Sequence, residues 1–97
     1  MDECLAQVAI DLSGRPAFVF NAPFRGAMIG EFPAELVEEF FKSVATNAKC
    51  NLHINVPYGT NNHHIAEAIF KAAAKGLRQA VSIDPRNDHV PSTKGSL

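Results

Sequence analysis

The sequence predicts a single small α+β domain, residues 1–97, in which two helices cover one face of a short sheet. Three observations lead to this fold class. Apolar and polar residues alternate in three segments, as they do in half-buried strands. Apolar residues recur at three- and four-residue steps in two other segments, as in amphipathic helices. Hydrophobic residues make up 46% of the chain and charged residues 20%, the balance of a folded domain.

The predicted order is strand, strand, helix, strand, helix (β-β-α-β-α), and it begins with a hairpin. Residues 5–12 (LAQVAIDL) have an apolar side and a side that carries Gln7 and Asp11, which predicts a strand. Residues 13–16 (SGRP) form a turn, and residues 17–21 (AFVFN) are expected to return beside the first strand. A glycine-containing loop is expected to follow through Gly26 and Gly30.

The first helix is expected to place Pro33 in its first turn, where the missing N–H of proline is no loss. Its apolar stripe consists of Leu36, Val37, Phe40, Phe41, Val44, Ala45 and Ala48. Residues 51–56 (NLHINV) alternate again and predict the third strand, with His53 on its polar side and a break at residues 57–59 (PYG).

The second helix is expected to start with Thr60 or Asn61 as its N-cap and to run to about Val81. Its three consecutive alanines, residues 72–74, favour helix intrinsically. Residues 82–97 are polar and contain two prolines, so an extended or looped tail is expected. The chain has no internal repeat or linker.

The composition argues against several classes of function. A formal net charge of −1 does not suit a surface that holds nucleic acid by bulk charge. No apolar run approaches the length of a membrane span, and the first residues do not resemble a signal peptide. Cys4 and Cys50 have neither metal nor redox spacing, so free thiols in a reducing compartment are expected. The cytoplasm is the expected location, with a plastid as the alternative in a plant.

Three strands and two helices expose more apolar surface than 97 residues can cover. We therefore expect another protein surface to pack against this domain.

The residues most informative about chemistry lie at the start of the second predicted helix. At about 100° per residue, His63, Glu67 and Lys71 lie along one edge of that helix, with His64 beside them. Two imidazoles and a carboxylate are good ligands for a divalent ion such as Mn²⁺, Fe²⁺ or Zn²⁺. Adjacent histidines point in different directions, so they serve two ions more naturally than one.

The alternative is purely structural. The histidines would then help to cap the helix, and Glu67 would pair with Lys71 one turn away. The pattern HHxxE alone does not decide between a metal site and this arrangement.

Other polar residues carry weaker signals. The stretch Pro91 to Gly95 (PSTKG) combines two hydroxyls, a cation and a glycine, which suits phosphate binding but is also typical of a solvated tail. Arg15 in the first turn and Glu39 on the first helix are simplest to interpret as surface charges.

Several segments together resemble the second half of imidazoleglycerol-phosphate dehydratase. They are GRPAFVFNA, ELVEEFFKSVATNA, LHI, NNHHIAEAIFKAAAKGLRQAV, DPR and PSTKG, in this order along nearly the whole chain. The combination of NxHHxxEAxFKA with PS[ST]KG is highly specific. The resemblance implies a fold like the second domain of ribosomal protein S5, and a full chain made of two similar halves.

The resemblance also implies the site. Its manganese ions, two per site, would be held partly by His63, His64 and Glu67, and the substrate phosphate by Lys71. The rest of the phosphate pocket would be Arg15, Ser92, Thr93 and Lys94. Many relatives carry a metal-binding histidine at the position of Glu39, so Glu39 is a doubtful ligand. Glu67 is also a weak candidate for catalytic proton transfer, since ligation would occupy it.

The implied reaction is the loss of water from imidazole glycerol phosphate to give imidazole acetol phosphate, a step of histidine biosynthesis. Metal coordination of the substrate's imidazole would stabilise developing negative charge. The implied partners are neighbouring subunits of a large homo-oligomeric cage and an N-terminal half, whose DHHxxED motif is absent here.

Three interpretations of the 97-residue chain remain open. It is a piece of the intact dehydratase, a stand-alone half-domain that binds metal without catalysis, or a half that pairs with a copy of itself. We expect no dehydratase activity from the chain alone.

Overall fold

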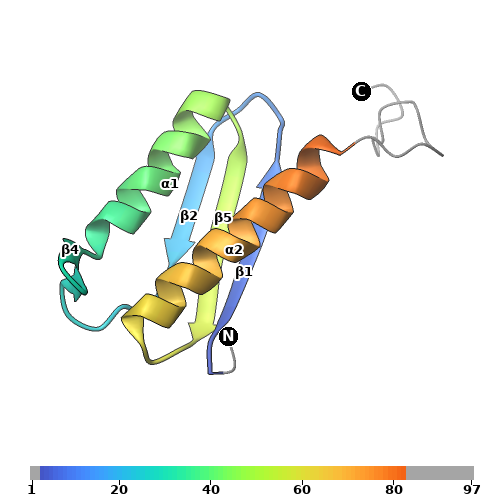
Figure 1. Cartoon of the computed structure of the whole chain (residues 1–97). Helices are drawn as coiled ribbons and strands as arrows, with labels where there is room; N and C mark the ends of the chain where they lie inside the picture. The colour runs from blue at the N-terminus through green and yellow to red at the C-terminus, as the bar shows by residue number, and fades with distance from the viewer. Residues whose placement is uncertain (1–2, 83–97) are drawn as a thin grey trace.

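The protein is described from a computed structural model that places residues 3–82 (Figure 1). It contains a three-stranded sheet, a short two-stranded hairpin and two helices. In chain order the elements are β1 (Leu5–Asp11), β2 (Ala17–Asn21), β3 (Met28–Ile29), β4 (Phe32–Pro33), α1 (Glu35–Ala48), β5 (Asn51–Tyr58) and α2 (Asn62–Val81).

The three-stranded sheet has the order β1-β5-β2, so β5 lies between the first two strands. It pairs antiparallel with β1 and parallel with β2. The predicted hairpin is therefore wrong in its pairing, although both strands exist. Residues 12–16 span two strand spacings, about 10 Å, instead of making a tight turn. Of the three strands, β5 has the most deeply buried apolar row. It therefore occupies the central position, where a neighbouring strand covers each of its two edges.

The strand alternation predicted from the sequence is confirmed. In β5, Leu52, Ile54 and Val56 are buried, while His53 and Asn55 are exposed. Ile54 aligns with Val8 of β1 on one side and with Phe20 of β2 on the other, which makes a continuous apolar row across the sheet. Both helices lie on one face of the sheet, as expected (Figure 1).

The sequence predicted that Pro33 lies in the first turn of α1. The structure places it in β4 instead. The short β3–β4 hairpin occupies part of the expected loop, with Gly30 at a φ of 58° in its turn. Ala34 donates its N–H to the carbonyl of Ala27 at 2.7 Å. Proline is tolerated here because a hairpin edge does not need every N–H. The helix then begins at Glu35.

Only part of the predicted apolar stripe of α1 is buried. Val37, Phe41 and Ala45 are in the core, whereas Leu36 and Phe40 remain 49% and 51% exposed. These two residues and the exposed Phe70 and Leu77 of α2 leave apolar surface on the helical layer. Phe40, Phe41, Phe70 and Leu77 also line an apolar groove between α1 and α2. The expectation of uncovered apolar surface is confirmed for the described part of the chain.

The junction between β5 and α2 positions the site. β5 continues through Pro57 to Tyr58, two residues past the strand end predicted at Val56, opposite a register irregularity in β1. Gly59 then passes so close to Cys4 and Ile65 that a methyl group there would lie 2.9 Å from the Cys4 sulfur. α2 follows with Asn61 as its N-cap and ends at Val81, as predicted.

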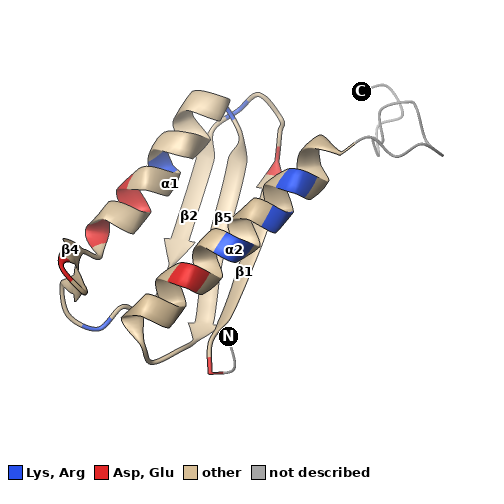
Figure 2. Cartoon of the chain, viewed as in Figure 1, with Lys and Arg blue, Asp and Glu red and all other residues tan. Residues whose placement is uncertain are grey.

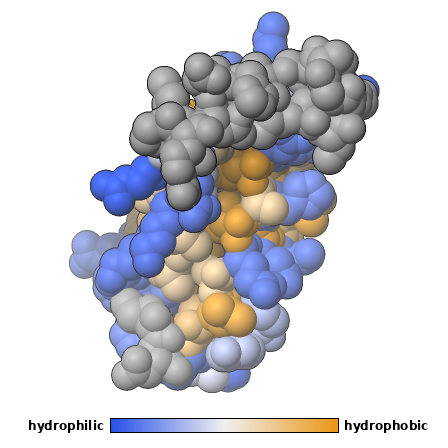
Figure 3. All heavy atoms as spheres, turned by 90° about the vertical axis from the view of Figure 1, so that its right-hand side faces the viewer, coloured by the Kyte–Doolittle hydropathy of each residue, from blue (hydrophilic) through white to orange (hydrophobic). Residues whose placement is uncertain are grey.

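The side view in Figure 3 shows apolar surface between hydrophilic side chains.

Cys4 and Cys50 are free and buried, which confirms that they are unpaired thiols. Among residues 3–82, no helix is both long and apolar enough to cross a membrane.

A candidate metal site at the start of helix α2

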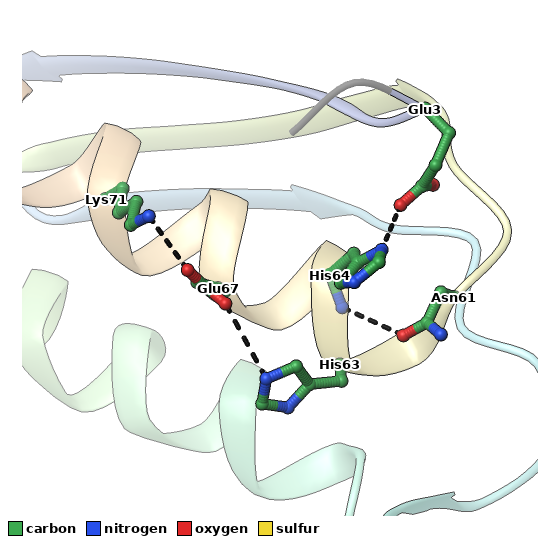
Figure 4. A network of polar contacts seen from close by, with 6 residues as sticks. All are labelled: Glu3, Asn61, His63, His64, Glu67 and Lys71. Carbon is green, nitrogen blue, oxygen red and sulfur yellow. Dashed lines mark hydrogen bonds and ion pairs between the residues drawn. The ribbon is translucent and has the colours of Figure 1, made fainter.

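Helix geometry places the candidate site residues. The Asn61 side chain accepts a hydrogen bond from the backbone N–H of His64 at 3.1 Å, which fixes the first turn of α2. His63, Glu67 and Lys71 follow at four-residue steps and therefore lie on one edge, as Figure 4 shows. Ile65, Ala66 and Ile69 are buried, and they anchor the helix against the sheet.

Glu67 contacts a side chain on each side. Its Oε1 lies 3.6 Å from Nε2 of His63, and its Oε2 lies 2.8 Å from Nζ of Lys71 (Figure 4). Two ligand atoms that each lie about 2.1 Å from one ion are roughly 3 to 3.5 Å apart. The His63–Glu67 pair is therefore close to the spacing required to chelate one divalent ion. The Glu67–Lys71 pair of the structural alternative is present as well.

The pKa of Glu67 is lowered from its ordinary value, chiefly by the hydrogen bond from Lys71. The positive charges of Lys71 and of the two histidines act in the same direction, while partial desolvation opposes them. Glu67 is therefore a carboxylate at neutral pH, the form that binds metal ions.

His64 lies apart from His63, as expected for adjacent helical residues. The two ring centroids are 6.2 Å apart and the ring planes are inclined by 59°. Nδ1 of His64 contacts the carboxylate of Glu3, which precedes β1 (Figure 4). The helix start thus carries two separate histidine–carboxylate pairs, His63 with Glu67 and His64 with Glu3.

Neither pair is a complete metal site. Within residues 3–82, no group of three or more His, Cys, Asp or Glu side chains is arranged to hold an ion. The donor types suit manganese, since imidazole and carboxylate are both ligands of such ions.

The remaining predicted site residues are not gathered at this place. Arg15 lies in the β1–β2 loop, where its carbonyl accepts a hydrogen bond from Asn51 at 3.1 Å. Asn51 begins β5, so Arg15 lies at the end of the sheet opposite to the start of α2. Glu39 is exposed on α1. Ser92, Thr93 and Lys94 lie outside the described residues.

Sequence reasoning did not single out Glu3 or Asn62. Glu3 reaches His64 across 61 positions, which no local pattern signals. The Asn62 side chain accepts from the backbone N–H of Arg25 at 2.8 Å and donates to the carbonyls of Arg25 and Met28. It thereby attaches the loop after β2 to the helix that carries the histidines. Its place in the NNHH stretch was the only signal available.

A mixed sheet covered by two helices places this chain among small α+β domains, and imidazole and carboxylate groups lie together at the start of α2. The family model described as imidazoleglycerol-phosphate dehydratase matches residues 1–77. The chain belongs to the imidazoleglycerol-phosphate dehydratase family.

Curated relatives carry the same description. The chain is 56% identical over 97 residues to the imidazoleglycerol-phosphate dehydratase of Rhodopirellula baltica, covering 100% of this chain and 48% of the relative. It is 58% identical over 98 residues to that of Methylorubrum populi, covering 100% and 50%. The chain therefore spans about half the length of the curated relatives it matches.

Solved structures agree in fold. The imidazoleglycerol-phosphate dehydratase of Staphylococcus aureus matches with a TM-score of 0.83 and 48% identity over 87% of this chain and 49% of that chain. That of Pyrococcus furiosus matches with a TM-score of 0.80 and 34% identity over 100% of this chain and 53% of that chain.

Proposed function

We propose that this chain supplies the C-terminal half of an imidazoleglycerol-phosphate dehydratase, which removes water from imidazole glycerol phosphate to give imidazole acetol phosphate. The observation that carries the proposal is the His63–Glu67 pair next to Lys71 on one edge of α2. It occurs in a chain that is 56% and 58% identical to two curated dehydratases.

In this proposal, His63, His64 and Glu67 are ligands for manganese, whose bound form stabilises negative charge that develops on the substrate's imidazole. His63 and Glu67 belong to one ion and His64 to a second, because the two rings diverge. Each ion needs further ligands from another half or another subunit. Glu39, on α1, is the least supported ligand, since no described contact links it to these residues.

Glu67 is a poor choice for the proton-transferring group. Its carboxylate already faces His63 and Lys71, and its pKa is lowered, so it is a weak base at neutral pH. A carboxylate from the other half of the enzyme is the better candidate. In this chain Glu67 then serves to hold the metal ion and to orient Lys71.

Lys71 is proposed to bind the substrate phosphate, which sets the position of the reacting carbon rather than the chemistry. Arg15, Ser92, Thr93 and Lys94 complete the phosphate pocket in the proposal. Arg15 lies at the opposite end of the sheet from the start of α2, so it would act in the site of a neighbouring copy. This placement supports active sites shared between the subunits of a larger homo-oligomer.

The apolar groove between α1 and α2 is proposed to be covered by the other half of the enzyme. Phe40, Phe70 and Leu77 line this groove and are 42–51% exposed. Full burial of one such side chain contributes about 1.5–3 kcal/mol, so the three together favour a partner. The alternative function is a half-domain that binds metal or self-assembles without catalysis, and this same uncovered groove is the observation that favours it.

The test is the mass and manganese content of the purified 97-residue chain, by light scattering and elemental analysis, with and without the other half. We expect no turnover from the chain alone, and manganese-dependent turnover when both halves are combined. A chelator should abolish that turnover. Turnover by the chain alone would show that a second copy replaces the other half. Absence of both metal and turnover in the combined preparation would contradict the proposed function.

A further inference from the structure

The contact between Glu3 and His64 joins two distant parts of the chain. Glu3 lies just before β1, and His64 lies in the first turn of α2. One carboxylate oxygen of Glu3 contacts Nδ1 of His64 (Figure 4). The other oxygen accepts a hydrogen bond from the backbone N–H of Thr60 at 3.4 Å. The carboxylate is therefore held from two directions.

The neighbouring residue fixes this arrangement. Cys4 is only 5% exposed, and it packs where Gly59 and Ile65 come together. The backbone at Glu3 is thus anchored in the core, although the side chains of Glu3 and His64 are 40% and 41% exposed. An isolated surface pair of this exposure contributes little to stability. The fold therefore fixes the orientation of the Glu3–His64 pair, although the pair adds little to the stability of the fold.

The contact determines which nitrogen of His64 is available. In neutral imidazole one ring nitrogen carries a proton and the other has a free lone pair. Donation from Nδ1 to the Glu3 carboxylate requires the proton on Nδ1 and leaves Nε2 as the acceptor. The carboxylate also orients the ring.

We propose that Glu3 is a positioning residue that holds His64 in the Nδ1–H tautomer, so that Nε2 binds the metal ion. The inference rests on the proposed function, in which His64 is a ligand. A carboxylate that accepts from the second nitrogen of a metal-binding histidine fixes the ring and raises its basicity. Glu3 is therefore part of the metal site without being a ligand itself.

The tautomer can be measured without metal. Long-range ¹H–¹⁵N spectra of the metal-free chain at alkaline pH distinguish the two neutral forms of His64. We expect the Nδ1–H form in the wild type and a shift toward the Nε2–H form in Glu3→Ala. Glu3→Gln keeps an acceptor oxygen and should largely preserve the Nδ1–H form. Glu31→Gln, which removes one negative charge from the β3–β4 turn, is the matched control and should change nothing. A wild type in the Nε2–H form, or no response to Glu3→Ala, would overturn the inference.

Manganese affinity provides the second measurement. Titration with Mn²⁺, followed by electron paramagnetic resonance, should give roughly 10- to 100-fold weaker binding in Glu3→Ala when the wild type binds. Glu3→Gln should be intermediate, and circular dichroism should show both variants folded. Equal affinity in wild type and Glu3→Ala would overturn the role of Glu3 and leave the proposed function intact. A wild type that binds no Mn²⁺ even with the other half would contradict the proposed function, while the tautomer spectra still decide the role of Glu3.

Discussion

Lys71 Nζ lies 2.8 Å from Glu67 Oε2, one turn along α2, while the other oxygen of the same carboxylate faces His63. One carboxylate therefore connects a proposed metal ligand with a proposed phosphate-binding lysine. Both side chains are exposed enough to change partners, with Lys71 66% and Glu67 35% exposed. Because Lys71 is proposed to bind phosphate and Glu67 to bind metal, substitutions at the two positions test separate roles.

Replacing Lys71 by alanine, in a chain joined to the other half, should weaken phosphate binding and leave manganese bound. A hydrogen bond to a charged group contributes about 1.5–3 kcal/mol, so the Kd for phosphate should rise roughly 10- to 100-fold. Isothermal titration with inorganic phosphate and elemental analysis of manganese measure the two effects. Lys94→Ala should behave in the same way, because it is assigned to the same pocket. Lys75→Ala, one turn further along α2, is the control. Loss of manganese with unchanged phosphate affinity would show that Lys71 has been assigned wrongly.

The Glu67–Lys71 pair should give the chain a specific dependence of stability on pH. Because the pKa of Glu67 is lowered from 4.5, the folded chain binds this proton less readily than the unfolded chain. The stabilisation is therefore complete above 4.5 and is lost as pH falls through the lowered pKa. We expect wild type to melt at a higher temperature than Glu67→Gln at pH 7, by a small amount because the pair is exposed. The difference should disappear at strongly acidic pH, and it should be largely absent in a Lys71→Met background.

Gly59 and Gly76 should respond in opposite ways to alanine. A methyl group at Gly59 would lie 2.9 Å from the Cys4 sulfur and 3.0 Å from Ile65, so Gly59→Ala should destabilise the fold by about 1–3 kcal/mol. At Gly76, inside α2, the nearest atom would be Ile10 Cδ1 at 3.4 Å. Gly76→Ala should be neutral or stabilising by up to about 1 kcal/mol, because alanine is the better helix former. Urea unfolding of the two variants measures this contrast, and equal effects would contradict the close packing at Gly59.

Asn62→Ala should release the loop after β2. The side chain makes three hydrogen bonds to the backbone of Arg25 and Met28, and their loss should cost about 1–3 kcal/mol. Hydrogen exchange at Arg25 should accelerate strongly. Asn61→Ala is the matched control, because it removes only the helix cap, costs about 1 kcal/mol and leaves the loop attached. Similar exchange at Arg25 in both variants would argue against this role of Asn62.

The part of the candidate site that lies on helix α2 was predictable from the sequence. The four-residue steps from His63 to Lys71 place these side chains on one edge of any helix, and the structure has them in contact. Glu3 was not predictable, because its approach to His64 depends on how β1 lies relative to α2. The position of Arg15 depends in the same way on the route of the chain across the sheet.

The sequence by itself determined the local elements. Alternation gave the three strands of the main sheet, and the three- and four-residue spacing gave both helices, because these periods are properties of neighbouring residues. Only the tertiary structure decided that β5 lies between β1 and β2, that Pro33 belongs to a small hairpin, and that Glu3 meets His64. These relationships are set by competition among distant segments for burial and for backbone hydrogen bonds, and no local pattern along the chain records the outcome of that competition.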